Sequence, residues 1–214
     1  MGQEAERPYS LEQGRELVKA ARYVIDSVAS TNKFSRWIAE ERLGRFGQKH
    51  GVFVTIEHYP TKALRGCIGY PLPERPIKQT LVDAAIAAAT EDPRFVPVSH
   101  MELNHILVEV NVLSSPVKIK ASTPESLKRQ IKIGRDGLII RYGYNSGLLL
   151  PIVAVEEDWN SDEFLENLCI KAGLPTTKWK NGQVHIEKFT SQVFRETSPQ
   201  DGVEEIMLAK AISR

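Results

Sequence analysis

The stretch Leu64–Tyr70 reads Leu-Arg-Gly-Cys-Ile-Gly-Tyr, and the rest of the chain is expected to be organised around it. It follows the apolar run 52–56 and precedes several prolines, which is typical of a short strand ending in a turn. Side chains of a strand alternate between two faces, so Arg65, Cys67 and Gly69 would share one face. A nearby cation favours thiolate over thiol, so the pattern predicts a reactive sulfur beside Arg65.

Gly66 and Gly69, which bracket Cys67, allow two interpretations. A glycine inside a strand marks a bulge or a close approach by backbone or ligand, which would make this strand a ligand-binding wall. Alternatively, Cys67 is a compact hydrophobic residue in a buried strand, and the glycines admit a packed helix. The residues alone leave both interpretations open.

Composition limits the function classes. The chain has 214 residues, of which 42% are hydrophobic and 26% charged, enough for one large domain or two lobes around a sizeable core. Its formal net charge of +1 gives no overall attraction to nucleic acid or to an anionic membrane. The longest apolar stretch, 148–155, is too short to span a bilayer. With 2 cysteines a disulfide framework is not expected, so we predict a cytoplasmic protein without membrane association.

Hydrophobic periodicity predicts an α+β protein. Helices are predicted over residues 11–29, 76–90, 125–130, 161–172 and 203–211, with Ser161 as a helix cap. Strands are predicted over residues 52–57, 64–70, 106–113, 138–142, 148–150 and 184–189. The stretch 32–50 mixes basic and aromatic residues, which could contact RNA. Its acidic residues favour a solvated helical face instead.

Three further stretches offer candidate site residues. Glu109 lies on the polar face of an alternating strand, either solvated or directed into a pocket as a base. Asp92 and Arg94 belong to an Asp-Pro-Arg-Phe turn, which is either held by its own exposed ion pair or lines a cleft. Arg135 lies between two glycines, where turn chemistry is the favoured explanation.

The sequence contains no phosphate-binding loop, dinucleotide fingerprint, nucleophile elbow or Cys-x-x-Cys pair. Its five histidines lack the spacing of metal-binding pairs, so no metal and no cofactor is predicted. Two hypotheses remain. In the first, Cys67 is a nucleophile or thiolate ligand beside Arg65, with a partner such as Glu109 or His58. In the second, the strand and Arg65 hold an anionic group, such as a nucleotide or RNA phosphate, without chemistry.

Several motifs in a fixed order carry a family resemblance. They are Leu-Arg-Gly-Cys-Ile-Gly at 64–69, Asp-Pro-Arg-Phe at 92–95, Val-Glu-Val at 108–110, Gly-Arg-Asp-Gly-Leu at 134–138, Ser-Gly-Leu-Leu-Leu-Pro at 146–151 and Leu-Cys-Ile-Lys-Ala-Gly-Leu-Pro at 168–175. Over residues 10–196 the chain resembles the AMMECR family, named after the Alport syndrome, midface hypoplasia and elliptocytosis chromosomal region, and it is similar to archaeal members. The stretch 32–50 has no match in this resemblance.

The resemblance implies an α+β fold of two unequal lobes, with antiparallel sheet flanked by helices and a cleft between the lobes. It implies a domain over 10–198, between an N-terminal tail (1–9) and a C-terminal tail (199–214), with both chain ends in the larger lobe. The family has no established activity, although its fold is grouped with folds that handle nucleotides and nucleic acids. Microbial members are associated with Memo-like and radical-SAM proteins.

From the residues and the resemblance together, we predict a site centred on Cys67. Cys67 and Glu109 are the candidate catalytic residues of an enzyme acting on a nucleotide or RNA-related substrate. The candidate substrate-binding residues are Arg65, Gly66, Gly69, Asp92, Arg94 and Arg135. The alternative is a non-catalytic module that binds a nucleotide, RNA or protein.

Overall fold

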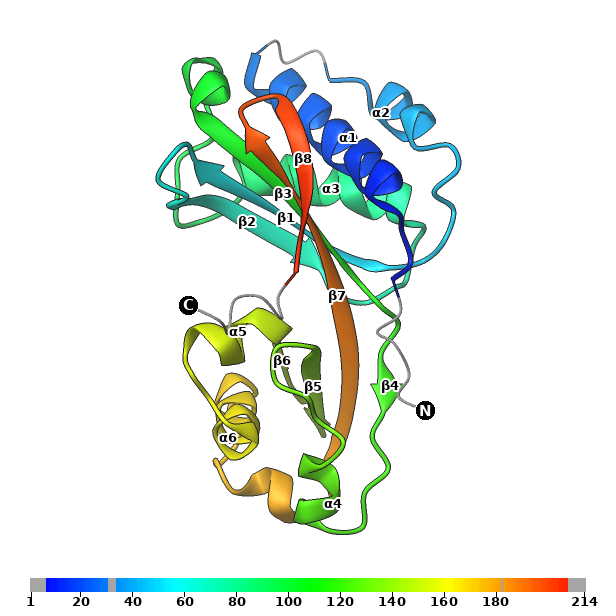
Figure 1. The fold of residues 1–214 in the computed structure, drawn as a ribbon, viewed down its shortest axis with the longest axis vertical. Helices are drawn as coiled ribbons and strands as arrows, with labels where there is room; N and C mark the ends of the chain where they lie inside the picture. The colour runs from blue at the N-terminus through cyan, green and yellow to red at the C-terminus, as the bar shows by residue number, and fades with distance from the viewer. Residues whose placement is uncertain (1–6, 31–33, 182, 208–214) are drawn as a thin grey trace. The chain divides into compact units, whose positions relative to one another are not determined.

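The computed structural model describes residues 7–30, 34–181 and 183–207 (Figure 1). They form an α+β fold whose sheet has the strand order β2-β1-β3-β7-β5-β6, with β4 and β8 also paired to β7. The pairings described in residue register are antiparallel, so the predicted fold class is confirmed. Of these residues, none belongs to a helix long and apolar enough to cross a membrane. The chain divides into a larger unit, residues 7–113 and 192–206, and a smaller unit around residues 114–191.

The larger unit packs helices on one face of a sheet. Its elements are α1 (Leu11–Ser30), α2 (Arg36–Arg42), β1 (Gly51–His58), β2 (Leu64–Tyr70), α3 (Ile77–Thr90), the 3-10 helix η1 (His100–His105), β3 (Ile106–Leu113), the second half of β7 (His185–Ser198) and β8 (Asp201–Ile206). Helix α3 packs on β1 and β2, and α1 packs on β3. Alternate residues of β1 and β3, among them Val54 and Val108, are buried in this core, as their spacing predicts.

The opposite face of the same strands carries polar side chains. Thr55 in β1 lies directly across from Cys67 in β2 and from Glu109 in β3. Because residues opposite one another in antiparallel strands project to the same face, the three side chains form one row. The alternation that buries Val54 and Val108 under the helices therefore places this row on the other face.

The smaller unit has a core of its own. Its elements are β4 (Val117–Lys118), α4 (Pro124–Lys128), β5 (Asp136–Tyr142), β6 (Asn145–Leu149), α5 (Pro151–Glu156), α6 (Ser161–Lys171), the 3-10 helix η2 (Lys178–Asn181) and the first half of β7. Phe164, Leu168 and Trp179 are buried in this core. Cys169 is 0% exposed among them, which confirms it as a packing residue. Asn160, rather than the predicted Ser161, caps α6 by accepting two backbone N–H groups.

The structure corrects the sequence reading near the C-terminus. The helix predicted over residues 203–211 is wrong at 203–206, because these residues belong to β8 and pair with β7. Residues 208–211 of that prediction, and the first six residues of the predicted N-terminal tail, lie outside the described residues. In the stretch 32–50, Arg36 pairs with Asp83 and Arg45 with Glu16, which supports the solvated helical face over RNA contact.

Strand β2 contains a bulge at Arg65. Gly66 lies across from Ile56 and Leu64 across from Glu57, so Arg65 has no residue opposite it in β1. An extra residue in one strand interrupts the period-two alternation. The prediction that Arg65 and Cys67 share a face by alternation is therefore wrong. The Arg65 guanidinium instead donates to Glu102 of η1, through Nε at 2.6 Å and Nη2 at 3.2 Å.

The ion pair at the bulge predicts a pH-dependent stability. Hydrogen bonds from Arg65, and further ones from Ser99, lower the pKa of Glu102 from 4.5 to about 2. A carboxyl with a lowered pKa stabilises the fold fully above its usual pKa and loses this contribution as the pH falls through its folded-state pKa. We expect Glu102→Gln to lower the free energy of unfolding at pH 7 by about 3 kcal/mol. Urea unfolding should show this difference from wild type shrinking between pH 4.5 and pH 2, and a constant difference would contradict the assignment.

Gly66 sets how closely α3 approaches β2. A Cβ atom built on Gly66 would lie 2.3 Å from the Ala88 carbonyl oxygen, so the helix or the strand would have to shift. We expect Gly66→Ala to lower the free energy of unfolding by about 1–3 kcal/mol, the usual cost of overpacking. Gly47→Ala is the control, because a Cβ there meets nothing within 4 Å. Equal effects of the two substitutions in urea unfolding would show that close packing at Gly66 does not matter.

Candidate functional site

The candidate site is built on the row of Cys67, Thr55 and Glu109. The Thr55 hydroxyl donates a hydrogen bond to Cys67 Sγ at 3.4 Å. Strand pairing places Glu109 on the other side of Thr55. The two candidate catalytic residues, chosen from separate stretches of sequence, thus lie on one sheet face, two strands apart, with Thr55 between them. His58, the other candidate partner for the thiol, ends β1 across from Ile106 and is not in the row.

The electrostatic surroundings keep the Cys67 thiol protonated. Burial raises its pKa above the ordinary value, the Thr55 hydrogen bond and the Arg94 guanidinium lower it, and the carboxylates of Glu109 and Asp92 raise it again. The result is a raised pKa, so the predicted activation of the thiolate by Arg65 is wrong. Arg65 is bound to Glu102, and the cation that acts on the sulfur is Arg94.

Asp92 fixes the backbone of Cys67. Its side chain is buried, and Oδ2 accepts the Cys67 backbone N–H at 2.8 Å. The Arg94 guanidinium donates to both carboxylate oxygens of Asp92, at 2.9 and 2.7 Å, and reaches the Cys67 carbonyl oxygen at 3.4 Å. These hydrogen bonds hold the pKa of Asp92 well below its usual range. The turn is therefore more than a self-contained ion pair, since it binds both polar groups of the Cys67 main chain.

Phe95 links the turn to the bulge. The guanidinium carbons of Arg65 and Arg94 lie 5.8 Å and 5.6 Å from the centre of its ring. Guanidinium groups at such distances from an aromatic face attract it. The two arginines chosen as candidate substrate-binding residues therefore contact the same ring, and each also has a carboxylate partner.

The close approaches that the two glycines allow come from within the protein. At Gly66 the approaching group is the backbone of α3, and at Gly69 it is the Phe53 ring, which would lie 2.3 Å from an added Cβ. This geometry favours the packing interpretation for both glycines. Arg135 belongs to the smaller unit, where it donates to both carboxylate oxygens of the buried Asp136, at 2.6 and 2.7 Å. Turn chemistry accounts for Arg135.

Sequence reasoning missed Arg195, a residue of β7 on the face of the Cys67 row. Its guanidinium lies 3.5 Å from a Glu57 oxygen, 3.9 Å from a Glu109 oxygen and 3.6 Å from a Glu204 oxygen. Three carboxylates around one guanidinium make this surface acidic. Arg195 follows the Cys67 motif by more than a hundred residues, and the only signal for it was its place in an alternating strand.

Three buried polar atoms on this face have no hydrogen-bond partner among the described residues. They are Arg195 Nε, Asn111 Oδ1 and Glu57 Oε2, the last of which still forms an ion pair with the Arg195 guanidinium at 3.5 Å. Asn111 lies across from Phe53, next to the row along β1 and β3, and is only 6% exposed. Buried polar groups are nearly always hydrogen-bonded, so unpaired ones gathered on one face mark it as a candidate for ligand contact. The described histidines, cysteines and carboxylates form no group of three that could hold a metal ion.

Comparison with known proteins gives the family. The AMMECR1 family model matches residues 18–194. A protein of Methanocaldococcus jannaschii is 46% identical over 197 residues, covering 92% of this chain and 96% of that protein. One of Methanocella arvoryzae is 46% identical over 202 residues, covering 94% of this chain and 99% of that protein. The crystal structure of an uncharacterised protein from Pyrococcus horikoshii has a TM-score of 0.81 and 42% identity, covering 92% of this chain and 97% of that one. The chain thus belongs to the AMMECR1 family.

Proposed function

We propose that this protein is a cysteine-dependent enzyme, with Cys67 as the nucleophile and Glu109 as its base. The observation that carries the proposal is the row itself, in which thiol, hydroxyl and carboxylate occupy facing positions on three adjacent strands. A thiol with a raised pKa needs a base at the moment of reaction. Glu109 lies close enough to act electrostatically on the sulfur, and it is positioned by a strand rather than by a loop.

In the proposed first step, Cys67 Sγ forms a bond to an electrophilic carbonyl carbon of the substrate. The electron pair of the attacked double bond moves to the carbonyl oxygen, and the thiol proton passes through an intervening water molecule to the Glu109 carboxylate, because Thr55 separates the two side chains. The Thr55 hydroxyl, which already donates to Sγ, would stabilise the developing thiolate. Asp92 and Arg94 position the nucleophile, because they hold the N–H and the carbonyl of Cys67.

The proposed substrate is nucleotide- or RNA-related, which rests on the fold-level likeness alone. The charges around Cys67 limit how such a substrate would bind. Glu57, Glu109 and Glu204 would repel a phosphate, and Arg195 is already shared among them. A substrate on this face would therefore present an uncharged carbonyl, such as that of a base, to the sulfur.

A second candidate is a non-catalytic nucleotide-, RNA- or protein-binding module. The raised pKa of Cys67 favours it, because a neutral, half-buried thiol is a poor nucleophile at rest. The polar atoms Asn111 Oδ1 and Arg195 Nε, which have no hydrogen-bond partner among the described residues, would then serve binding alone.

A thiol alkylation profile tests the electrostatics of the proposed site. We expect iodoacetamide to modify Cys67 with a midpoint above the ordinary thiol pKa of about 8.5. Because the Glu109 carboxylate raises the pKa of Cys67, Glu109→Gln should lower that midpoint. Peptide mapping by mass spectrometry separates Cys67 from the buried Cys169, which serves as the internal control and should not change. A Cys67 midpoint that Glu109→Gln leaves unchanged would remove Glu109 from the site.

A substrate search separates the enzyme from the binding module. Wild-type protein is incubated with pooled nucleotides and short RNAs, and products and Cys67 adducts are read by mass spectrometry. We expect adducts or products that Cys67→Ser abolishes and that Glu109→Gln slows about 100-fold, the effect of losing a general base. Glu125→Gln, at an exposed position of the smaller unit, is the matched charge control. Neither product nor adduct with any pool member would contradict the enzyme and favour the binding module instead.

A further inference from the structure

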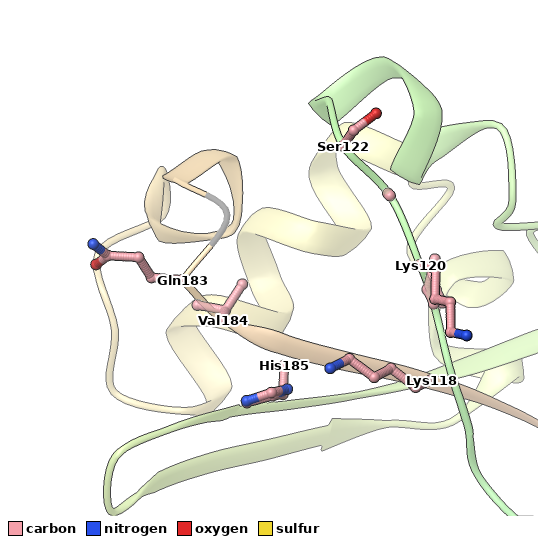
Figure 2. A pocket seen from close by; sticks show the side chains of 8 residues that line it. Lys118, Lys120, Ser122, Gln183, Val184 and His185 are labelled. Atoms are coloured by element: carbon pink, nitrogen blue, oxygen red, sulfur yellow. The ribbon is translucent and has the colours of Figure 1, made fainter.

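The smaller unit contains a surface hollow of about 560 Å³ that lies outside the Cys67 site. It is lined by two segments that are far apart in sequence, 118–122 and 183–185. Figure 2 shows Lys118, Lys120 and Ser122 on one segment and Gln183, Val184 and His185 on the other. Strand pairing joins the segments, since β4 pairs with β7 and the Ile119 N–H donates to the Ile186 carbonyl. The volume is within the usual range of small-molecule sites.

The lining of this hollow carries cations and no carboxylate. Lys118 and Lys120 are exposed, and neither side chain has an ion-pair or hydrogen-bond partner within the described part of the chain. Glu187 lies across from Lys118 in β7, but its carboxylate binds Arg141. Gln183 and His185 add an amide and an imidazole to the same lining. An anionic group entering here would meet two unpaired ammonium groups.

A second, narrower hollow adjoins the first, because the two have lining residues in common. The two share Ile119, Ala121, Ser122 and Val184, and the narrower one is also lined by Leu127, Trp179 and Ile186. Trp179 is only 3% exposed, yet its Nε1 has no hydrogen-bond partner among the described residues. A buried donor without an acceptor destabilises the fold, and a bound acceptor would recover that loss. This buried, unpaired N–H is a second and independent indication of a ligand.

We propose that these two hollows form one binding site for a small organic anion with a flat, largely apolar body. The anionic group lies between Lys118, Lys120 and His185, and the body lies along Ile119 and Val184 toward Trp179. An acceptor atom on the body receives the Trp179 N–H. Both hollows lie in the smaller unit, whereas Cys67 lies in the larger one, so this site stands independently of the proposed thiol chemistry.

Calorimetric titration with adenosine monophosphate tests the site, because this probe combines a phosphate with a flat body carrying acceptors. We expect saturable binding, at least 10-fold tighter than that of adenosine or of inorganic phosphate, each of which offers only half of the interaction. The double variant Lys118→Gln, Lys120→Gln should weaken binding at least 10-fold. The matched control is Lys19→Gln, Lys171→Gln, which removes two exposed charges elsewhere and should leave binding unchanged.

Trp179→Phe tests the inner part of the site, because it keeps an aromatic ring but removes the N–H together with the five-membered part of the indole. We expect it to weaken the monophosphate about 5-fold, the effect of one hydrogen bond, with inorganic phosphate unaffected. Cys67→Ser should change nothing. Three results would each overturn the proposal. The first is an equal loss of affinity in the Lys118/Lys120 and the control double variants, the second is equal affinity for the monophosphate and inorganic phosphate, and the third is no binding of the monophosphate.

Discussion

The hydrogen bond from the Cys67 N–H to the Asp92 carboxylate is the interaction on which the candidate site depends. Strand β2 lies at the end of the strand order, so one row of its backbone groups has no neighbouring strand to pair with. Asp92 satisfies the N–H of that row at Cys67, and Arg94 neutralises the buried carboxylate that does so. Removing Arg94 would leave a buried charge, and removing Asp92 would leave an unpaired N–H beside the sulfur. Asp92 and Arg94 therefore fix the main chain of Cys67. Neither of them occupies the Sγ atom, which lies in the row beside Thr55.

Period-two alternation was sufficient to predict much of this site. In β3 the valines occupy alternate positions, so Glu109 had to lie on the opposite face. Because the helices cover the face with the valines, Glu109 lies on the face that the helices leave uncovered. The same reasoning failed at Arg65. A bulge depends on the register against β1 and on a carboxylate in η1, Glu102, which lies 37 residues further along the chain. Neither is visible in the heptapeptide, so the sequence could not show that Arg94, rather than Arg65, is the cation acting on Cys67.

Residues brought in from distant segments could not be predicted either. Arg195 reaches the Cys67 face only because β7 joins β3 in the sheet, a pairing that no local pattern specifies. The segment 203–206 has apolar residues at both ends and two glutamates between, a spacing that fits one helical turn. The segment is nevertheless part of strand β8, because it pairs with β7. In both cases a long-range partner, rather than intrinsic propensity, determines the structure.

The near-neutral total charge conceals two local environments of opposite sign. Around Cys67, three glutamates share one arginine, so a phosphate there would face net negative charge. Around the hollow of the smaller unit, Lys118 and Lys120 have no carboxylate partner among the described residues, so a phosphate there would be attracted. Coulombic effects on this scale fall off within about 10 Å at moderate salt, so the total of +1 predicts neither. A search for the ligands of this protein should therefore separate anionic molecules, which suit the hollow, from uncharged electrophiles, which suit the thiol.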